Sequence, residues 1–358
     1  MKRFIIKTFL YSLPVILLIV YYAVLVKPYI GGDLGLLGQI VFVDDSIQPP
    51  NFHKSPISCE YCNVPEDSCV LIIGDSFSNK EGIGRYSDFL AEWSNLPIYN
   101  LQFDWWRGHL FNQFIYLSKV QPLPRIVIIE SVERELVSRL VNTQVGLSPQ
   151  MMIERGVIDT ASIAVAKKKS TMAKNNSHLA TLFSGTQEFA KKRMGIDNPV
   201  KKAALSVPMF SCSGKENNLY FYEDDLRVSS KESVCMAKNE LENLFAYADS
   251  LGIHLYVLVA ADKYDIYQPY IVDNTYSKSF VLDSLAAMCN SPQFINSKDT
   301  LSAMACNGVC DIYSCGDTHW SAIGAEAVAK MVAERITAQE EDTTLFSTKP
   351  KISAKMSL

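Results

Sequence analysis

The chain has 358 residues, a formal net charge of −4 and 34 basic against 38 acidic side chains. A balance this close to neutral lacks the basic surface that nucleic-acid binding requires, and it predicts neither a strongly acidic nor a strongly basic partner. The length is enough to bury a large core, as one large domain or as one domain with an insertion.

The N-terminus has the pattern of a membrane anchor. Lys2, Arg3 and Lys7 accompany an almost entirely apolar run from Thr8 to Val26, which is long enough to span a bilayer core. We predict that residues 1–27 form a single-pass transmembrane signal anchor in the inner membrane, with the rest of the chain on the periplasmic, extracytoplasmic side. A cleaved signal peptide is the main alternative, although the run lacks a clear small-x-small cleavage site.

The cysteines indicate an oxidising compartment. The chain has nine of them, and an odd count leaves at least one outside any intramolecular pair. Cys59-x-x-Cys62 resembles half a zinc site, but no second pair has suitable spacing, and no ligand cluster indicates a metal or another cofactor. Disulfides are the preferred interpretation, for instance within 59–69, 212–235 and 289–315.

A buried strand followed by a serine organises the first half of the chain. Residues 28–69 show no sustained periodicity and are expected to form a linker. Residues 70–73, Val-Leu-Ile-Ile, read as a buried parallel strand that ends at Gly74, Asp75 and Ser76. This places the Ser76 hydroxyl at the carboxyl end of a strand, where α/β proteins put their chemistry. A serine that only caps a helix is the alternative.

Strands and helices alternate after this serine. We expect a helix at 79–95, a strand at 97–101, a helix that reaches Val120, a strand at 125–130 and a helix capped by Ser131. Strand–helix alternation at this spacing predicts an α/β fold with a doubly wound parallel sheet.

Residues 141–230 interrupt the alternation and are expected to form a central insertion with one or two helices, for example at 178–194. Its clusters of lysine and arginine could meet an anionic glycan or lipid headgroups, but a solvated surface is the default interpretation. The elements expected after the insertion are a helix at 231–251, a strand at 253–260, a polar aromatic loop at 261–267, a helix at 279–290, a helix at 321–337 and a flexible tail at 338–358.

A second block completes a candidate reaction site. Asp317 and His319 lie two residues apart, in a segment expected to be extended just before the last helix, so both can point into one site. Serine is a weak nucleophile without an adjacent base. His319 would take the proton of Ser76, and Asp317 would orient the imidazole and stabilise its cation. A surface histidine beside a helix is the alternative for His319.

Both blocks resemble a known superfamily. Ile-Gly-Asp-Ser-Phe-Ser and Gly-Asp-Thr-His-Trp-Ser-Ala-Ile-Gly-Ala resemble the nucleophile and Asp-x-His-Trp blocks of SGNH-hydrolase-like proteins, and more narrowly the alginate O-acetyltransferase-like branch. Residues 124–136 resemble that branch's strand ending in Glu-x-x-Glu-Arg, and residues 260–267 resemble its Pro-Asp-Lys-x-x-x-Tyr loop. The resemblance implies a flavodoxin-like SGNH fold over residues 70–337.

The chain departs from that branch in two respects. In the alginate proteins the Asp-x-His block precedes the serine block, whereas here it follows. The usual oxyanion blocks are also not clear: Gly108 could replace the first, and Glu130 and Arg134 occupy the place of the second. The backbone N–H of Ser76 or Phe77 is a further oxyanion candidate. Arg134 could add positive charge or instead pair with a glutamate of its own segment.

Four aromatic residues lie on loops at predicted strand ends: Trp105, Trp106, Tyr264 and Tyr267. Flat aromatic faces suit sugar rings, although packing is the commoner role of such residues.

The resemblance implies an extracytoplasmic polysaccharide O-acetyltransferase that works through an acetyl-serine intermediate on Ser76. Its acceptor would be a polysaccharide, and a membrane-bound O-acyltransferase would bring the acetyl group across the membrane. The same Ser-His-Asp triad also suits a carbohydrate acetyl esterase, and an inactive glycan-binding scaffold is the third possibility. The intact triad disfavours the scaffold, whereas no residue pattern separates transfer from hydrolysis.

Overall fold

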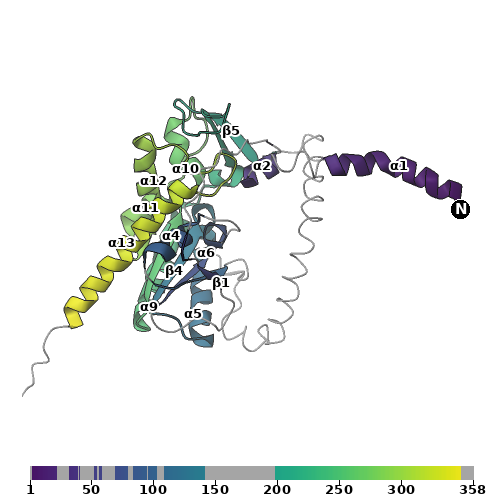
Figure 1. The fold of residues 1–358 in the computed structure, drawn as a ribbon. Helices are drawn as coiled ribbons and strands as arrows, with labels where there is room; N and C mark the ends of the chain where they lie inside the picture. The colour runs from purple at the N-terminus through teal and green to yellow at the C-terminus, as the bar shows by residue number, and fades with distance from the viewer. Residues whose placement is uncertain are drawn as a thin grey trace, which may run out of the picture.

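A parallel β-sheet organises the chain. The computed structural model describes residues 2–21, 32–38, 40, 52–54, 56–58, 69–79, 84–94, 96–102, 109–141 and 198–347. The sheet has the order β1-β3-β2-β4-β7-β8, and all neighbouring strands are parallel. Figure 1 shows the described chain, with β1 and β4 of this sheet labelled. Its strands are β1 (Ile57–Ser58), β2 (Val70–Gly74), β3 (Ile98–Gln102), β4 (Ile126–Val132), β7 (His254–Ala260) and β8 (Phe294–Asn296).

The strand order is that of a flavodoxin-like sheet. From β3 onward the order β3-β2-β4-β7-β8 places the second strand outside the first and the remaining strands on the other side, which is the doubly wound arrangement. Every residue of β2 and β4 is buried, as their continuous apolar runs predict for strands covered on both faces. The predicted α/β fold with a parallel sheet is therefore confirmed.

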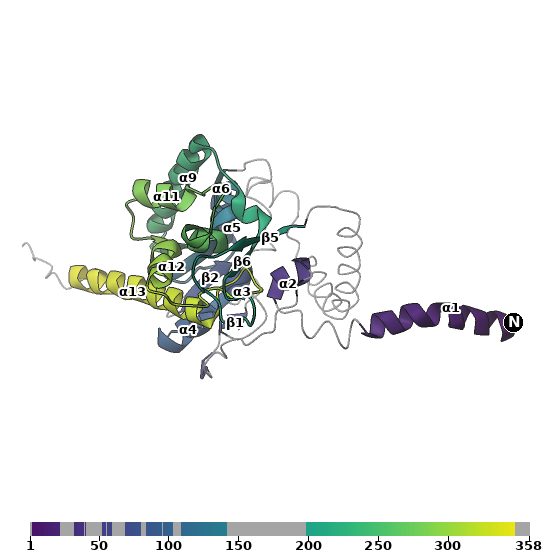
Figure 2. The ribbon, with the colours of Figure 1, turned by 90° about the horizontal axis from the view of Figure 1, so that it is seen from above.

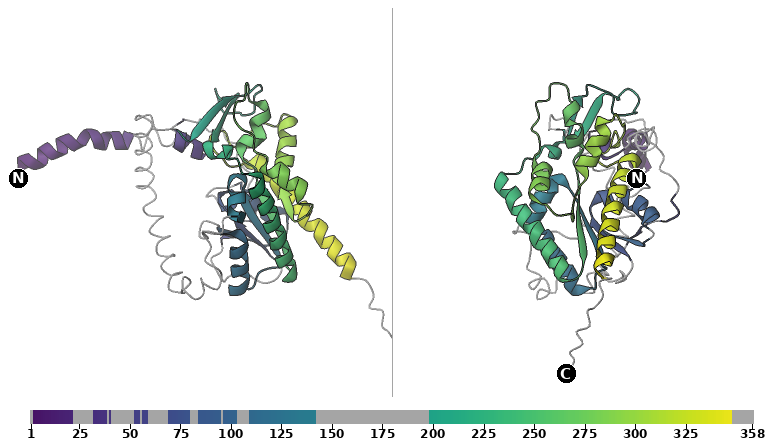
Figure 3. Two further views of the ribbon diagram at one scale, coloured as in Figure 1. Left: turned by 180° about the vertical axis from the view of Figure 1, so that it is seen from behind. Right: turned by 90° about the vertical axis from the view of Figure 1, so that its left-hand side faces the viewer.

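Helices cover both faces of this sheet. Helix α13 packs against α4 and α12, whereas α9 packs against α5, α6 and α11. Figure 3 shows α9 and α13 on opposite sides of the sheet. The helices are α4 (Tyr86–Trp93), α5 (Leu110–Val120), α6 (Glu133–Val141), α9 (Lys231–Ser250), α11 (Val281–Met288), α12 (Ser297–Cys306) and α13 (Ala322–Ser347). Short helices α3 (Ser76–Asn79), α10 (Lys263–Tyr267), η5 (Glu223–Leu226) and η6 (Gln268–Tyr270) follow strands or join helices.

The chain changes direction across the sheet at β2. It leaves β2 to form β3 on one side and then returns to form β4 on the other side. Connections that diverge from neighbouring strands open a crevice at their carboxyl ends, and α/β proteins bind ligands there. The topology therefore directs attention to the residues that follow β2 and β4.

The segment expected to be a linker contains structure that packs on the domain. Helix α2 (Gly32–Gly38) contacts β5 and β6, as Figure 2 shows from above. Leu34 is fully buried, and the Gly35 N–H donates to the Gly316 carbonyl at 3.1 Å. Gly32 has a φ of +73° and lies so close to Gly316 that a Cβ atom would collide with its carbonyl. Residues 32–38 were expected to belong to a linker because their local pattern is irregular. They are ordered by packing against distant parts of the chain, which local periodicity does not reveal.

The described part of the predicted insertion contains an antiparallel pair, β5 (Val200–Ala204) and β6 (Asn218–Tyr222). The helix predicted at 178–194 lies outside the described residues.

Helix α1 (Lys2–Tyr21) begins the described chain. Among the helices that the structure describes, none combines the length and the apolar character that crossing a membrane requires. The predicted span continues to Val26, and residues 22–27 lie outside the described part of the chain.

Three local boundaries differ from the prediction. Ser131 belongs to β4 rather than capping a helix, because β4 continues to Val132 alongside β7. The loop expected at 261–267 contains α10, whose five residues are all buried. Helix α13 continues to Ser347, so the first part of the tail expected at 338–358 is helical.

The turn after β2 gives a test of packing. A Cβ atom on Gly74 would collide with Ser78 Oγ and would lie 2.6 Å from Glu130 Oε2. We expect Gly74→Ala to lower the free energy of unfolding by about 3 kcal/mol, the upper range for overpacking a core. The matched control is Gly214→Ala, where φ is +72° but no atom lies within 4 Å; its strain costs about 1 kcal/mol. Urea denaturation measures the free energy of unfolding of both variants. Equal losses in the two variants would contradict the packing argument.

Candidate active site

The turn between β2 and α3 presents Ser76. The Asp75 side chain folds over this turn, and its Oδ1 accepts the Phe77 N–H at 3.2 Å. Ser76 itself is exposed, although it follows five buried strand residues and Asp75, which is also buried. The hydroxyl therefore stands at the solvent-facing end of the strand, as the sequence predicts.

The structure brings the three predicted triad residues together. His319 Nε2 lies 2.7 Å from Ser76 Oγ, and His319 Nδ1 lies 2.5 Å from Asp317 Oδ1. The same carboxylate oxygen accepts the His319 backbone N–H at 3.0 Å, so Asp317 orients both the ring and the main chain of His319. This is the geometry in which a histidine can act as general base on a serine.

A buried lysine positions the loop that carries the histidine. We call residues 314–319 the histidine loop. Lys263 Nζ donates to the carbonyls of Ser314, Cys315 and Asp317 at 2.8, 2.9 and 3.1 Å. Burial lowers the pKa of Lys263 to about 8. The Asp-Lys pair of the 260–267 block is the sequence signal that could have indicated this role.

A second carboxylate reaches the histidine loop from α2. Asp33 Oδ1 accepts the Thr318 N–H at 2.8 Å, and Asp33 Oδ2 accepts the Thr318 hydroxyl at 2.5 Å. The same Asp33 oxygen lies 3.6 Å from His319 Nδ1. Sequence reasoning missed Asp33, because nothing in its irregular segment marks it as functional.

Asp33, Asp317 and His319 place their ligand atoms within 4.8 Å of one another, close enough to share a metal ion. The hydrogen bonds to Thr318 and His319 already account for this proximity, so we interpret the group as a positioning network.

A buried network supports the serine from behind. The Asp75 N–H and the Ser78 hydroxyl donate to Glu130 Oε2 at 3.0 and 2.8 Å. Asp75 Oδ2 accepts the Val132 N–H at 3.1 Å and pairs with Arg139 at 2.9 Å. Burial, then the charge of Asp75, raises the pKa of Glu130 well above its ordinary value. Burial opposes ionisation of Asp75 as well, but the Arg139 guanidinium and its hydrogen bonds bring its pKa below the ordinary value.

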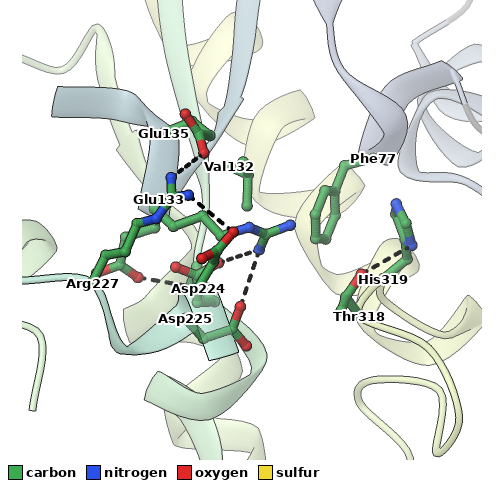
Figure 4. A network of polar contacts seen from close by, with 12 residues as sticks. Phe77, Val132, Glu133, Glu135, Asp224, Asp225, Arg227, Thr318 and His319 are labelled. Atoms are coloured by element: carbon green, nitrogen blue, oxygen red, sulfur yellow. Dashed lines mark hydrogen bonds and ion pairs between the residues drawn. The ribbon is translucent and has the colours of Figure 1, made fainter. Parts of the chain in front are cut away.

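The Phe77 ring packs against the side chains of His319 and Trp320. Its ring centroid lies 4.7 Å from those of both His319 and Trp320. Figure 4 shows Phe77 with His319 and Thr318 on one side and a network that includes Asp225 and Arg227 on the other. The Phe77 N–H is engaged by Asp75, so of the two predicted oxyanion donors Ser76 N–H is the one with no partner among the described residues.

Arg134 lies in an ion-pair network rather than pairing with a glutamate of its own segment. Its guanidinium contacts Asp262 Oδ1 at 2.5 Å and Asp225 Oδ1 at 3.3 Å. Burial works against the charged guanidinium, but these two carboxylates outweigh it and raise the pKa of Arg134. For the Asp225 carboxylate, burial is the largest effect, and it raises the pKa of this group to about 6. Arg134 thus joins α6 to the start of α10.

The two tyrosines predicted to face a sugar are fully buried. Tyr264 is 0% exposed, and its hydroxyl bonds with Asn274 at 3.0 Å. Tyr267 is also 0% exposed, and its hydroxyl accepts the Tyr313 N–H at 3.3 Å. The prediction of a sugar platform at these two positions is corrected: helix α10 turns both rings into the core. Gly108, Trp105 and Trp106 lie outside the described residues.

Comparison with known families agrees with this site. Residues 212–356 match a family model, the SGNH hydrolase-like domain of acetyltransferase AlgX. The resemblance predicted from the sequence is confirmed. No curated protein and no solved structure matches the chain. The matched region contains Lys263, Asp317 and His319, whereas Ser76 precedes it.

The two carboxylates near His319, those of Asp33 and Asp317, are expected to contribute unequally to activity. Asp317→Asn should lower kcat/KM for cleavage of an activated acetyl ester by about 10⁴-fold, because an amide favours the wrong imidazole tautomer. Asp33→Asn should lower kcat/KM by about tenfold, because Asp33 positions the loop mainly through its hydrogen bonds to Thr318. Steady-state kinetics would measure both, with the exposed Asp299→Asn as control. Equal losses for Asp33→Asn and Asp317→Asn would contradict these assignments.

The buried ammonium of Lys263 predicts a pH-dependent stability. Its pKa is about 8 in the folded chain and 10.5 ordinarily. Between these values the unfolded chain binds more protons, so this group makes stability rise with pH. The free energy of unfolding of the wild type minus that of Lys263→Met should therefore increase by about 3 kcal/mol from pH 8 to 10.5. Urea denaturation across this range measures the difference. Parallel profiles would refute the assignment, and the exposed Lys231→Met provides the control.

Proposed function

We propose that this protein is a polysaccharide O-acetyltransferase that works through an acetyl-serine intermediate on Ser76. The observation that carries the proposal is the 2.7 Å contact between His319 Nε2 and Ser76 Oγ in a chain whose residues 212–356 match an acetyltransferase domain. The nucleophile, the base and the orienting carboxylate are all present, which supports an enzyme over an inactive scaffold.

The proposed first half-reaction uses the three residues of the triad. Ser76 Oγ attacks the acetyl carbonyl while His319 Nε2 takes its proton, and Asp317 stabilises the resulting imidazolium. The Ser76 N–H, at the first position of α3, has no intrahelical partner and can donate to the oxyanion. His319 then returns its proton to the leaving group, and acetyl-Ser76 remains.

The second half-reaction transfers the acetyl group. An acceptor sugar hydroxyl loses its proton to His319 Nε2 and attacks the acetyl carbonyl, and the serine hydroxyl is regenerated. We propose a polysaccharide as acceptor. We also propose an extracytoplasmic location, because the nine cysteines of the chain are typical of an oxidising compartment. A cytoplasmic acetyl donor is out of reach there, so a membrane-bound O-acyltransferase would have to supply the acetyl group.

Hydrolysis is the second candidate. Ser76 is exposed, so water can approach the acetyl-serine as readily as a sugar. A carbohydrate acetyl esterase would use the same three residues and differ only in the nucleophile that resolves the intermediate.

Mass spectrometry can separate these functions. The full-length chain is incubated with an activated acetyl ester, with and without candidate oligosaccharides, and acetyl groups on Ser76 and on the sugar are followed. We expect acetyl-Ser76 and sugar acetylation in the wild type, and neither in Ser76→Ala. The exposed Ser206→Ala should behave as the wild type.

The other outcomes point elsewhere. Acetate release with no sugar product across the acceptor panel would favour the esterase. A folded protein that forms neither acetyl-enzyme nor product would reject both enzymes and favour the glycan-binding scaffold.

A further inference from the structure

A segment of the predicted insertion runs beside the chain that leads into the histidine loop. The Asp311 N–H donates to the Met209 carbonyl at 2.9 Å, and the Ser211 N–H donates to Asp311 Oδ1 at 2.9 Å. One step away, the Cys310 thiol contacts the Pro208 carbonyl at 3.7 Å. Residues 208–212 and 310–315 therefore lie side by side, although about a hundred residues separate them along the chain.

This contact brings two cysteines together. Cys212 is 9% exposed and Cys315 is 6% exposed, and their side chains are hydrogen-bonded to each other. That hydrogen bond and burial both raise the pKa of the Cys315 thiol. A disulfide requires two cysteines whose side chains point toward each other, and a hydrogen bond between the two side chains meets this requirement.

This contact joins two cysteines that spacing did not pair, and the structure has no disulfide in either of the pairs expected there. The sequence favoured disulfides within 212–235 and 289–315. Cys235 is exposed on α9, and Cys289 ends α11, which packs with α9 on the other side of the sheet from α13. The fold therefore places Cys212 against Cys315, and not against Cys235 or Cys289.

We propose that Cys212 and Cys315 form a disulfide bond that cross-links the predicted insertion to the histidine loop. A thiolate of one cysteine attacks a disulfide oxidant, either a small-molecule disulfide or a disulfide-exchange protein, and forms a mixed disulfide. The second thiolate displaces the oxidant's remaining sulfur. Two thiol protons are lost, one S–S bond forms in the chain, and the oxidant leaves as two thiols.

The bond would act on the same residue that Lys263 positions. The Cys315 carbonyl accepts the Lys263 ammonium at 2.9 Å, and Cys315 lies two residues before Asp317. A cross-link here fixes the first half of the histidine loop covalently, close to the carboxylate that orients His319. Because few thiolates form at a buried thiol of raised pKa, the bond should form during folding rather than afterwards.

Peptide mapping of the wild-type chain tests the pairing. The full-length reduced protein is unfolded in urea, refolded in a mixture of reduced and oxidised glutathione, and treated with N-ethylmaleimide in denaturant. Refolding is checked by a cooperative thermal transition. We expect a proteolytic peptide pair joined through Cys212 and Cys315, which separates on reduction with dithiothreitol.

Thermal unfolding gives a second readout. Dithiothreitol should lower Tm by about 5–10 °C in the wild type, as expected for a cross-link that closes a long loop. The same shift should occur in Cys235→Ser and Cys306→Ser, whose cysteines are exposed. The shift should be smaller in the double variant Cys212→Ser/Cys315→Ser, where dithiothreitol cannot act on this bond.

Two results would overturn the proposal. One is modification of Cys212 and Cys315 by N-ethylmaleimide in the refolded wild type; the other is a disulfide that joins either residue to a different cysteine. The mapping needs no variant, so a variant that fails to fold does not affect it. It also uses no acetyl transfer, so its outcome is independent of the proposed enzymatic function.

Discussion

One buried ammonium group sets the position of the histidine loop. Lys263 Nζ meets three backbone carbonyls, those of Ser314, Cys315 and Asp317, in a place almost closed to water. A buried cation is costly unless it is paired or hydrogen-bonded, and buried carbonyls are costly without donors. Each side of this contact therefore requires the other. The turn that results presents Asp317 and His319 toward Ser76.

The charged residues around the triad hold its side chains in position. Asp75, Glu130 and Arg139 stabilise the serine turn, while Lys263 and Asp33 stabilise the histidine loop. Such networks fix side chains to the small tolerance that proton transfer between serine and histidine needs. The two networks meet where His319 contacts the Ser76 hydroxyl and the Phe77 ring; Ser76 and His319 lie 243 positions apart in the chain.

The match to a known family and the fold give complementary information. The matched region, residues 212–356, includes the histidine loop and its lysine, whereas the serine comes from β2, which lies before it. That region contains the proposed base and the proposed orienting carboxylate but not the proposed nucleophile. The sheet topology supplies the missing residue, since β2 lies at the point where the chain changes direction.

The sequence alone determined the elements whose signals are local. Continuous apolar runs predicted β2 and β4, and Gly-Asp-Ser after one strand and Asp-x-His before the last helix predicted the triad, because these patterns depend on neighbours a few residues apart. Only the tertiary structure decided the partner of Arg134, the burial of Tyr264 and Tyr267, the contact of Asp33 with Thr318 and that of Cys212 with Cys315. Each joins segments distant in the chain, and which side chains meet there depends on how whole elements pack. No local pattern records that information.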